Sequence, residues 1–164
     1  MRGILISEVQ SRVQIAIDAY TAGIIDGEGS IIMSRSSTKN KYGVFPYWTL
    51  KMQVVSCDEE LVIWLKEQWG GAYNRYARRG INHRPAYRWT VVGDNMRAVL
   101  VATLPYLLLK KEKAEWASEA LNIQAEPRVP WSKYSEEKTA KLAEIRQRFV
   151  DHTKRIKLER ERNA

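Results

Sequence analysis

The sequence of 164 residues is poor in the side chains that hold zinc or form disulfides: it contains one cysteine, Cys57, and two histidines, His83 and His152. A single cysteine cannot form an internal disulfide, and these three residues cannot supply a four-ligand zinc site without carboxylates. Zinc fingers and cysteine–histidine proteases are therefore excluded. We expect Cys57 to be a small, buried hydrophobic residue.

Long apolar segments are also missing. The longest stretch without a charged residue, 98–109, is interrupted by Pro105 and is too short to cross a bilayer. The N-terminus has a brief apolar run that ends before Glu8, with no small-residue cleavage pattern after it. We therefore expect an intracellular protein without a membrane partner, in the cytoplasm of a prokaryote or inside an organelle.

Acidic residues are absent from two windows of a basic chain. Lys and Arg number 27 against 19 Asp and Glu, which gives a net charge of +8. Residues 31–57 and 71–93 hold nine basic residues and no acidic one: Arg35, Lys39, Lys41, Lys51, Arg75, Arg78, Arg79, Arg84 and Arg88. This distribution favours a polyanion as the partner.

The hydrophobic periodicity predicts the order helix, hairpin, helix, hairpin, helix. The helices are expected at 13–25, 59–69 and 94–104, and the strands at 30–38, 46–55, 73–79 and 85–92. Gly27 and Gly29 are expected to end the first helix. This order of helices and hairpins indicates an α+β fold. Because the acid-free windows coincide with the hairpins, we expect helices on one face of the sheet and positive charge on the other.

The C-terminal part of the chain is predicted to be a separate element. A helical pattern resumes over 107–123, and a linker with two prolines covers 127–135. A charged helix follows, with an apolar stripe that includes Leu142, Ile145 and Phe149. We therefore expect a main domain over 1–126, and a linker and amphipathic helix over 127–164 that belong to it or dock on it.

Period-two alternation separates the two faces of the predicted sheet. Along the second strand, Trp48, Leu50, Met52 and Val54 alternate with Tyr47, Thr49, Lys51 and Gln53. Arg, Lys, Gln, Ser and Thr are the side chains that read base edges or hold phosphates. The alternative is a solvated face, but such a face usually mixes charges of both signs. The pattern favours a nucleic-acid-binding face.

The segment 21–30, Thr-Ala-Gly-Ile-Ile-Asp-Gly-Glu-Gly-Ser, resembles the LAGLIDADG motif of homing endonucleases. It keeps the small pair Ala22 and Gly23, an apolar pair, Asp26, an acid at Glu28 and the final glycine. Thr21 stands where the motif begins with leucine. Ala22, Gly23 and Gly27 lack bulk, so this helix can approach a second backbone closely.

The resemblance implies a fold, an activity and an assembly. The fold would be the family's αββαββα core, a four-stranded antiparallel saddle sheet covered by helices, here with a C-terminal helical extension. A chain with one motif copy works as a homodimer in this family, so Ala22, Gly23 and Gly27 would form the interface. The dimer would cut both strands of a long, near-palindromic DNA site with two or more Mg²⁺ ions at the dyad.

The resemblance also assigns residues to roles. The carboxylate of Glu28 and the carbonyl of Gly27 would hold metal, and water would be the nucleophile. Lys110 aligns with a lysine of the family's catalytic pocket; its alternative is an ordinary surface lysine that opens a charged helix. Ser56 stands where relatives place a water-positioning glutamine, which leaves that role unassigned. The expected DNA-binding residues are Ser34, Ser36, Thr49, Lys51, Gln53, Arg75, Arg79 and Arg88, with Lys51, Arg75 and Arg88 on one sheet face.

Two other functions compete with cleavage. Relatives of this fold also act as RNA splicing maturases or as DNA-binding regulators, so intron RNA is an additional partner to consider. Regulators commonly lose the motif acid, and Glu28 is present, which favours catalysis. An interaction protein with a basic helical tail would explain residues 135–164 but not the acid-free hairpins.

Overall fold

The computed structural model describes residues 2–76, 84–126 and 135–163. The chain begins with helix α1 (Arg2–Glu28), followed by the hairpin of β1 (Gly29–Asn40) and β2 (Gly43–Ser56). Helix α2 (Glu59–Trp69), strands β3 (Ala72–Tyr76) and β4 (Ala86–Val91), and helix α3 (Gly93–Thr103) complete the αββαββα order. Helices α4 (Lys111–Ala125) and α5 (Glu136–Arg162) follow. The predicted fold class is confirmed.

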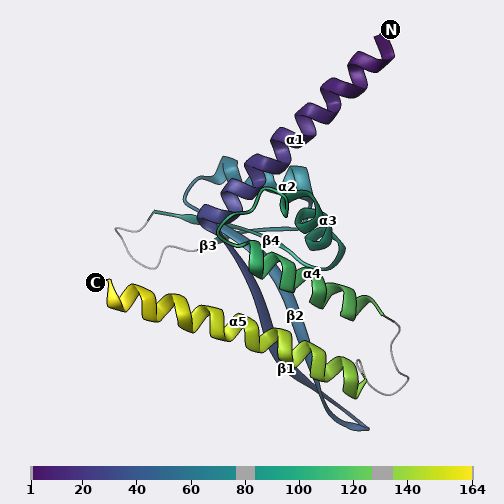
Figure 1. The fold of residues 1–164 in the computed structure, drawn as a ribbon, viewed down its shortest axis with the longest axis vertical. Helices are drawn as coiled ribbons and strands as arrows, with labels where there is room; N and C mark the ends of the chain where they lie inside the picture. The colour runs from purple at the N-terminus through teal and green to yellow at the C-terminus, as the bar shows by residue number, and fades with distance from the viewer. Residues whose placement is uncertain (1, 77–83, 127–134, 164) are drawn as a thin grey trace.

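The four strands form one antiparallel sheet in the order β1-β2-β4-β3, so β1 and β3 are its edges. Figure 1 shows α1, α2 and α3 gathered at one end of the sheet, while α4 and α5 cross the long β1–β2 hairpin. The N-terminal half of α1 projects away from the body of the molecule (Figure 1). No helix among the described residues is long and apolar enough to span a membrane.

The hydrophobic core lies between the helices and one face of the sheet. The alternation predicted for β2 and β4 is confirmed, because every second residue is buried: Trp48, Leu50, Met52, Val54, Tyr87, Trp89 and Val91. On β1, Ile31 and Met33 face the same core. The residues of the opposite face are half-buried or exposed.

The C-terminal helix docks on this core, as its apolar stripe predicts. Leu142, Ile145 and Phe149 of α5 are buried, and the rings of Trp116 and Phe149 meet edge to face at 5.7 Å between centroids. The linker predicted over 127–135 lies, apart from Ser135, outside the described residues. Ser135 caps α5 by accepting a hydrogen bond from the backbone N–H of Lys138 at 3.2 Å.

Helix α1 differs from its prediction at both ends. It begins at Arg2 and runs through Gly27 to Glu28, so Gly27 does not end it. Gly29 makes the turn into β1 possible, because a Cβ at this position would lie 2.6 Å from the carbonyl oxygen of Ile25. Only a residue without a side chain allows the strand to leave the helix this closely.

Thr21, which replaces the first leucine of the motif, is fully buried and joins α1 to α2. Its hydroxyl donates to the carbonyl of Ile17 at 2.8 Å and accepts the indole N–H of Trp69 at 3.0 Å. A leucine could not accept this hydrogen bond. The departure from the motif is therefore matched by a tryptophan at the end of α2.

We predict that Thr21→Val lowers the free energy of unfolding by about 1–3 kcal/mol, because it leaves the indole N–H of Trp69 without its acceptor. Thr103→Val is the matched control. Thr103 is equally buried and donates to the carbonyl of Val99 at 2.7 Å, but no donor among the described residues depends on its hydroxyl. Urea unfolding of both variants should show the larger loss for Thr21→Val, and equal losses would contradict the assigned role.

Candidate active site and nucleic-acid interface

Glu28 is the last residue of α1, and its side chain is exposed. Among the described residues it takes part in no hydrogen bond or ion pair, so its carboxylate oxygens are available to a ligand. The carbonyl of Gly27 belongs to the last turn of the helix, where carbonyls have no partner within the helix. The end of α1 thus presents hard oxygen atoms, at a helix terminus whose dipole repels a lone anion.

Asp26 ties the segment before α4 to the end of α1. Its carboxylate accepts the backbone N–H groups of Leu108, Leu109 and Lys110 at 2.7, 3.2 and 2.9 Å. The ammonium group of Lys110 donates in turn to the backbone carbonyl of Asp26. Three charge-assisted bonds to consecutive amides fix the conformation of this segment. Sequence reasoning assigned Asp26 no role, since no pattern links positions so far apart in the chain.

Lys110 lies beside the motif acids. Burial lowers the pKa of its ammonium group, and the negative charges of Asp26 and Glu28 oppose that shift. The structure therefore brings together Glu28 and Lys110, the two residues that sequence reasoning assigned to cleavage. A partly desolvated lysine next to an available carboxylate is suited to stabilise negative charge that develops on a phosphate.

The open face of the sheet carries most of the predicted DNA-binding residues. In the antiparallel register, Ser34 pairs with Thr49, Ser36 with Tyr47 and Val55 with Arg88. Paired residues share a face, and these alternate with the buried core positions. This face, called the polar face below, contains Ser30, Ser34, Ser36, Thr49, Lys51, Gln53, Asn74, Arg88 and Thr90. It contains no acidic residue among the described strands.

Arg75 is not on the polar face, and the prediction that it projects with Lys51 and Arg88 is wrong. Arg75 pairs with Tyr87, whose side chain is buried in the core, whereas Arg88 pairs with Asn74. Arg75 is exposed because it lies near the end of an edge strand. Asn74 is the residue of β3 that sequence reasoning missed. Arg79 lies outside the described residues.

The small residues of the motif divide between the two sides of α1. Gly23 and Gly27 are exposed, and a Cβ at either position would meet no atom within 4 Å. Ala22 is fully buried in the core of its own chain, so its assignment to a subunit interface is wrong. Gly23 and Gly27 lie four residues apart and so share one helix face. In the part of the chain that the structure describes, no atom occupies the space beside that face.

At the end of β2 the structure corrects the prediction for Cys57 and shows what Ser56, whose role was unassigned, contacts. Cys57 is exposed rather than buried, because it occupies the turn between β2 and α2. The hydroxyl of Ser56 accepts the backbone N–H of Asp58 at 3.0 Å, and Asp58 caps α2. Ser56 is thus part of this turn, and it pairs with Tyr87 on the core side of the sheet.

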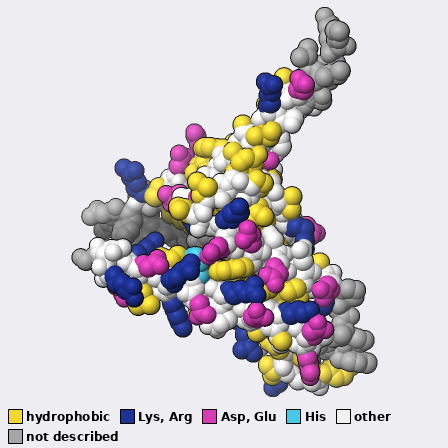
Figure 2. Space-filling view, in the orientation of Figure 1, with side chains coloured by type: hydrophobic (Ala, Val, Ile, Leu, Met, Phe, Trp, Pro, Cys, Tyr) yellow, Lys and Arg dark blue, Asp and Glu magenta, His cyan; other side chains and the backbone are white. Residues whose placement is uncertain are grey.

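The helical face of the molecule contrasts with the polar face. Figure 2 shows lysine, arginine and acidic side chains intermixed over α4 and α5, with hydrophobic side chains collected around α1. Many of these charges are paired, as in the contacts of Arg148 with Glu119 at 3.1 Å and Glu144 at 2.8 Å. Among the described residues, basic side chains without neighbouring acids thus lie on the sheet and at its edge, and not on the outer side of α4 and α5.

The chain resembles solved structures of homing endonucleases. I-CvuI, solved with DNA in the presence of Mg and with the DNA not cleaved, has a TM-score of 0.63 at 18% identity, over 82% of this chain and 80% of the other. The archaeal intron-encoded I-Vdi141I in complex with DNA has a TM-score of 0.63 at 18% identity, over 82% of each chain.

In a third similar structure, the matched region is less than half of the other chain. The LAGLIDADG homing endonuclease I-SmaMI, bound to cleaved DNA, has a TM-score of 0.62 at 17% identity, over 79% of this chain but 42% of the other. No protein-family model and no curated relative matches this sequence. The structural similarity confirms the resemblance that the motif indicated: the chain has the fold of the LAGLIDADG homing endonucleases.

Proposed function

We propose that this protein is a site-specific DNA endonuclease that works as a homodimer and hydrolyses phosphodiesters with Mg²⁺. The observation that carries the proposal is the meeting of Glu28 and Lys110 at the end of the motif helix, where β1 and the polar face begin. The DNA-bound homing endonucleases of the same fold support DNA as the partner.

The donor set at the end of α1 fits Mg²⁺. Glu28 and the carbonyl of Gly27 would hold the ion, and both are hard oxygen donors. Asp26 is engaged by the segment before α4, and no three acidic, histidine or cysteine side chains gather into a metal cage in the described part of one chain. A second copy, water and DNA phosphates would therefore complete the coordination. The bound ion would stabilise the attacking and leaving oxygens of an in-line displacement.

The residues of this chain position and stabilise the reacting phosphodiester. Water attacks phosphorus, the bond to the leaving sugar oxygen breaks, and the new ends carry a phosphate and a hydroxyl group. Lys110, held by Asp26, places its ammonium group where negative charge develops on the phosphate oxygens. Lys51, Gln53 and Arg88 of the polar face orient the duplex over this point.

Two copies of the chain would meet through α1. Gly23 and Gly27 leave a face of the helix that is open at the level of the backbone, and this face ends at Glu28. Packing two such faces around a twofold axis places two carboxylates near each other, which requires a cation between them. One subunit then supplies half of the site.

We predict that Glu28→Gln abolishes cleavage while DNA affinity stays within about tenfold, because the change removes a metal ligand and leaves the polar face of the sheet intact. Plasmid cleavage in Mg²⁺ and fluorescence anisotropy with duplex DNA measure the two properties. Glu8→Gln, an exposed acid on the same helix, is the control and should cut normally. Cleavage by purified Glu28→Gln would refute the assignment.

We predict that Asp26→Asn lowers the cleavage rate by about a hundredfold, because an amide cannot accept on both sides and Lys110 loses its position. The free energy of unfolding should fall by about 1–3 kcal/mol. Asp18→Asn is the control, since the side chain of Asp18 on the same helix accepts, within the described chain, only from exposed Gln14 at 2.7 Å. The same cleavage rate for both variants in single-turnover assays would contradict this role for Asp26.

We predict that Gly23→Leu yields a monomer, because its side chain occupies the space into which the second helix would pack. The helix itself should persist, since leucine has a higher helix propensity than glycine. Sedimentation equilibrium measures the mass, and Ala143→Leu on the exposed side of α5 provides the control. A dimeric, active Gly23→Leu protein would place the interface elsewhere.

A further inference from the structure

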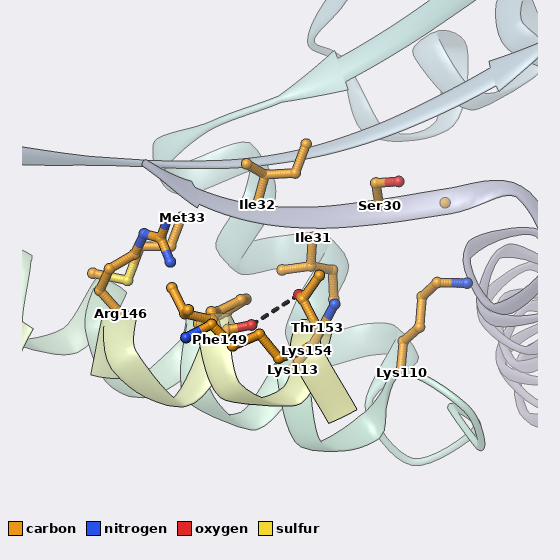
Figure 3. A pocket seen from close by; sticks show the side chains of 12 residues that line it. Ser30, Ile31, Ile32, Met33, Lys110, Lys113, Arg146, Phe149, Thr153 and Lys154 are labelled. Atoms are coloured by element: carbon orange, nitrogen blue, oxygen red, sulfur yellow. Dashed lines mark hydrogen bonds between the residues drawn. The ribbon is translucent and has the colours of Figure 1, made fainter. Parts of the chain in front are cut away.

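A cavity of about 470 Å³ lies under the edge of the sheet, between β1 and helix α5. The first residues of β1 form one wall, and Phe149 and Val150 of α5 form the other. Figure 3 shows Lys110 at one end of the cavity and Lys113, Arg146 and Lys154 around it. No acidic residue lines this cavity within the described chain.

Basic residues of α5 lie both beside the cavity and on the opposite side of the helix. Two on the opposite side are paired: Arg148 with Glu119 and Glu144, and Arg155 with Glu112. Those that face the cavity, Arg146 and Lys154, form no ion pair with any described residue. The cations beside the cavity are thus without an ion pair among the described residues, although α5 is rich in charge of both signs.

Lys113, from the first turn of α4, completes this group. It also has no described acidic partner, and burial together with the positive charge of nearby Lys110 lowers the pKa of its ammonium group. Holding several cations around one partly enclosed space costs free energy unless an anion compensates. The cavity therefore has the chemistry of an anion site.

The position of the cavity indicates which anion it takes. Lys110 belongs both to the cavity and to the site at Glu28, so the two are continuous. Ser30 and Ile32 point from β1 toward the polar face, whereas Ile31 points into the cavity (Figure 3). A DNA strand that leaves the polar face over the edge of β1 would carry its next phosphates past these cations.

We propose that the cavity between β1 and α5 binds the phosphate backbone of DNA next to the cleavage point, and that Lys113, Arg146 and Lys154 are its phosphate ligands. The proposal rests on the proposed function for the identity of the ligand. These contacts carry no base specificity, because phosphates are alike at every sequence. Their role is to add affinity and to fix the strand against Lys110.

The test compares two double variants that each remove two positive charges from α5. Arg146→Gln with Lys154→Gln alters the cavity, while Arg148→Gln with Arg155→Gln alters the opposite side, where both residues are ion-paired. DNA affinity is measured by anisotropy without divalent ions at several salt concentrations. The probes are a duplex that spans the dimer and contains the cleavage site, a duplex of random sequence, and an RNA of the same length.

The cavity variant should lose affinity by the same factor for both DNA duplexes. Its plot of log affinity against log salt should become shallower by about 0.9 for each phosphate that a subunit no longer neutralises. The control variant should keep the wild-type slope. Equal slopes for the two variants would overturn the proposal, as would a loss confined to RNA. If the wild-type protein cuts DNA in Mg²⁺ while the slopes are equal, only the cavity proposal fails; a wild type that does not cut contradicts the proposed nuclease itself.

Discussion

The hydrogen bonds between the Asp26 carboxylate and three consecutive backbone amides join parts of the chain that are otherwise independent. They connect the end of the motif helix to the segment that leads into α4, and so determine where Lys110 lies relative to Glu28. The two acids of the motif therefore have different tasks. Asp26 is engaged within the fold, while Glu28, two residues later, keeps its oxygens free for a ligand.

Charge is sorted by surface in this molecule, and the sorting follows from the architecture. Helices α4 and α5 carry both signs of charge in close pairs on their outer side. The polar face of the sheet and the cavity at its edge carry cations and neutral polar groups without described acids. Among the described residues, a polyanion that approaches the sheet thus meets attraction from its cations and repulsion at the motif acids, where a divalent cation would compensate the negative charge.

The sequence was sufficient for features that depend on local periodicity. Alternation along β2 and β4 identified the core face, because a buried sheet face imposes a period of two. It failed for Arg75, since the face of a short edge strand depends on its register with β4, and that register depends on a connection that periodicity does not describe. The prediction for Ala22 failed for a similar reason. Small residues show that another element can approach the helix closely, but not on which side of the helix this occurs.

Contacts between distant segments were not predictable from spacing. Nothing in the local pattern shows that Asp26 holds the backbone at 108–110, or that Arg146 and Lys154 of α5 lie beside β1. Thr21 stands where the motif has leucine, and its hydrogen bond with the indole of Trp69 is evident only in the structure. The motif resemblance placed Glu28 and Lys110 at one site, and the fold brings them together there. These long-range contacts are the part of the site that required three-dimensional information.

The central claim, that the dimer cuts a symmetric DNA site with Mg²⁺, is tested most directly by incubating the purified protein with a random-site DNA library and sequencing the ends produced. A homodimeric, Mg²⁺-dependent endonuclease should produce ends only when Mg²⁺ is present, within near-palindromic sites of about 20 base pairs or more, since each subunit spans about one helical turn. Binding of the library without any ends in Mg²⁺ would contradict this claim and favour a non-cleaving nucleic-acid-binding protein of the same fold.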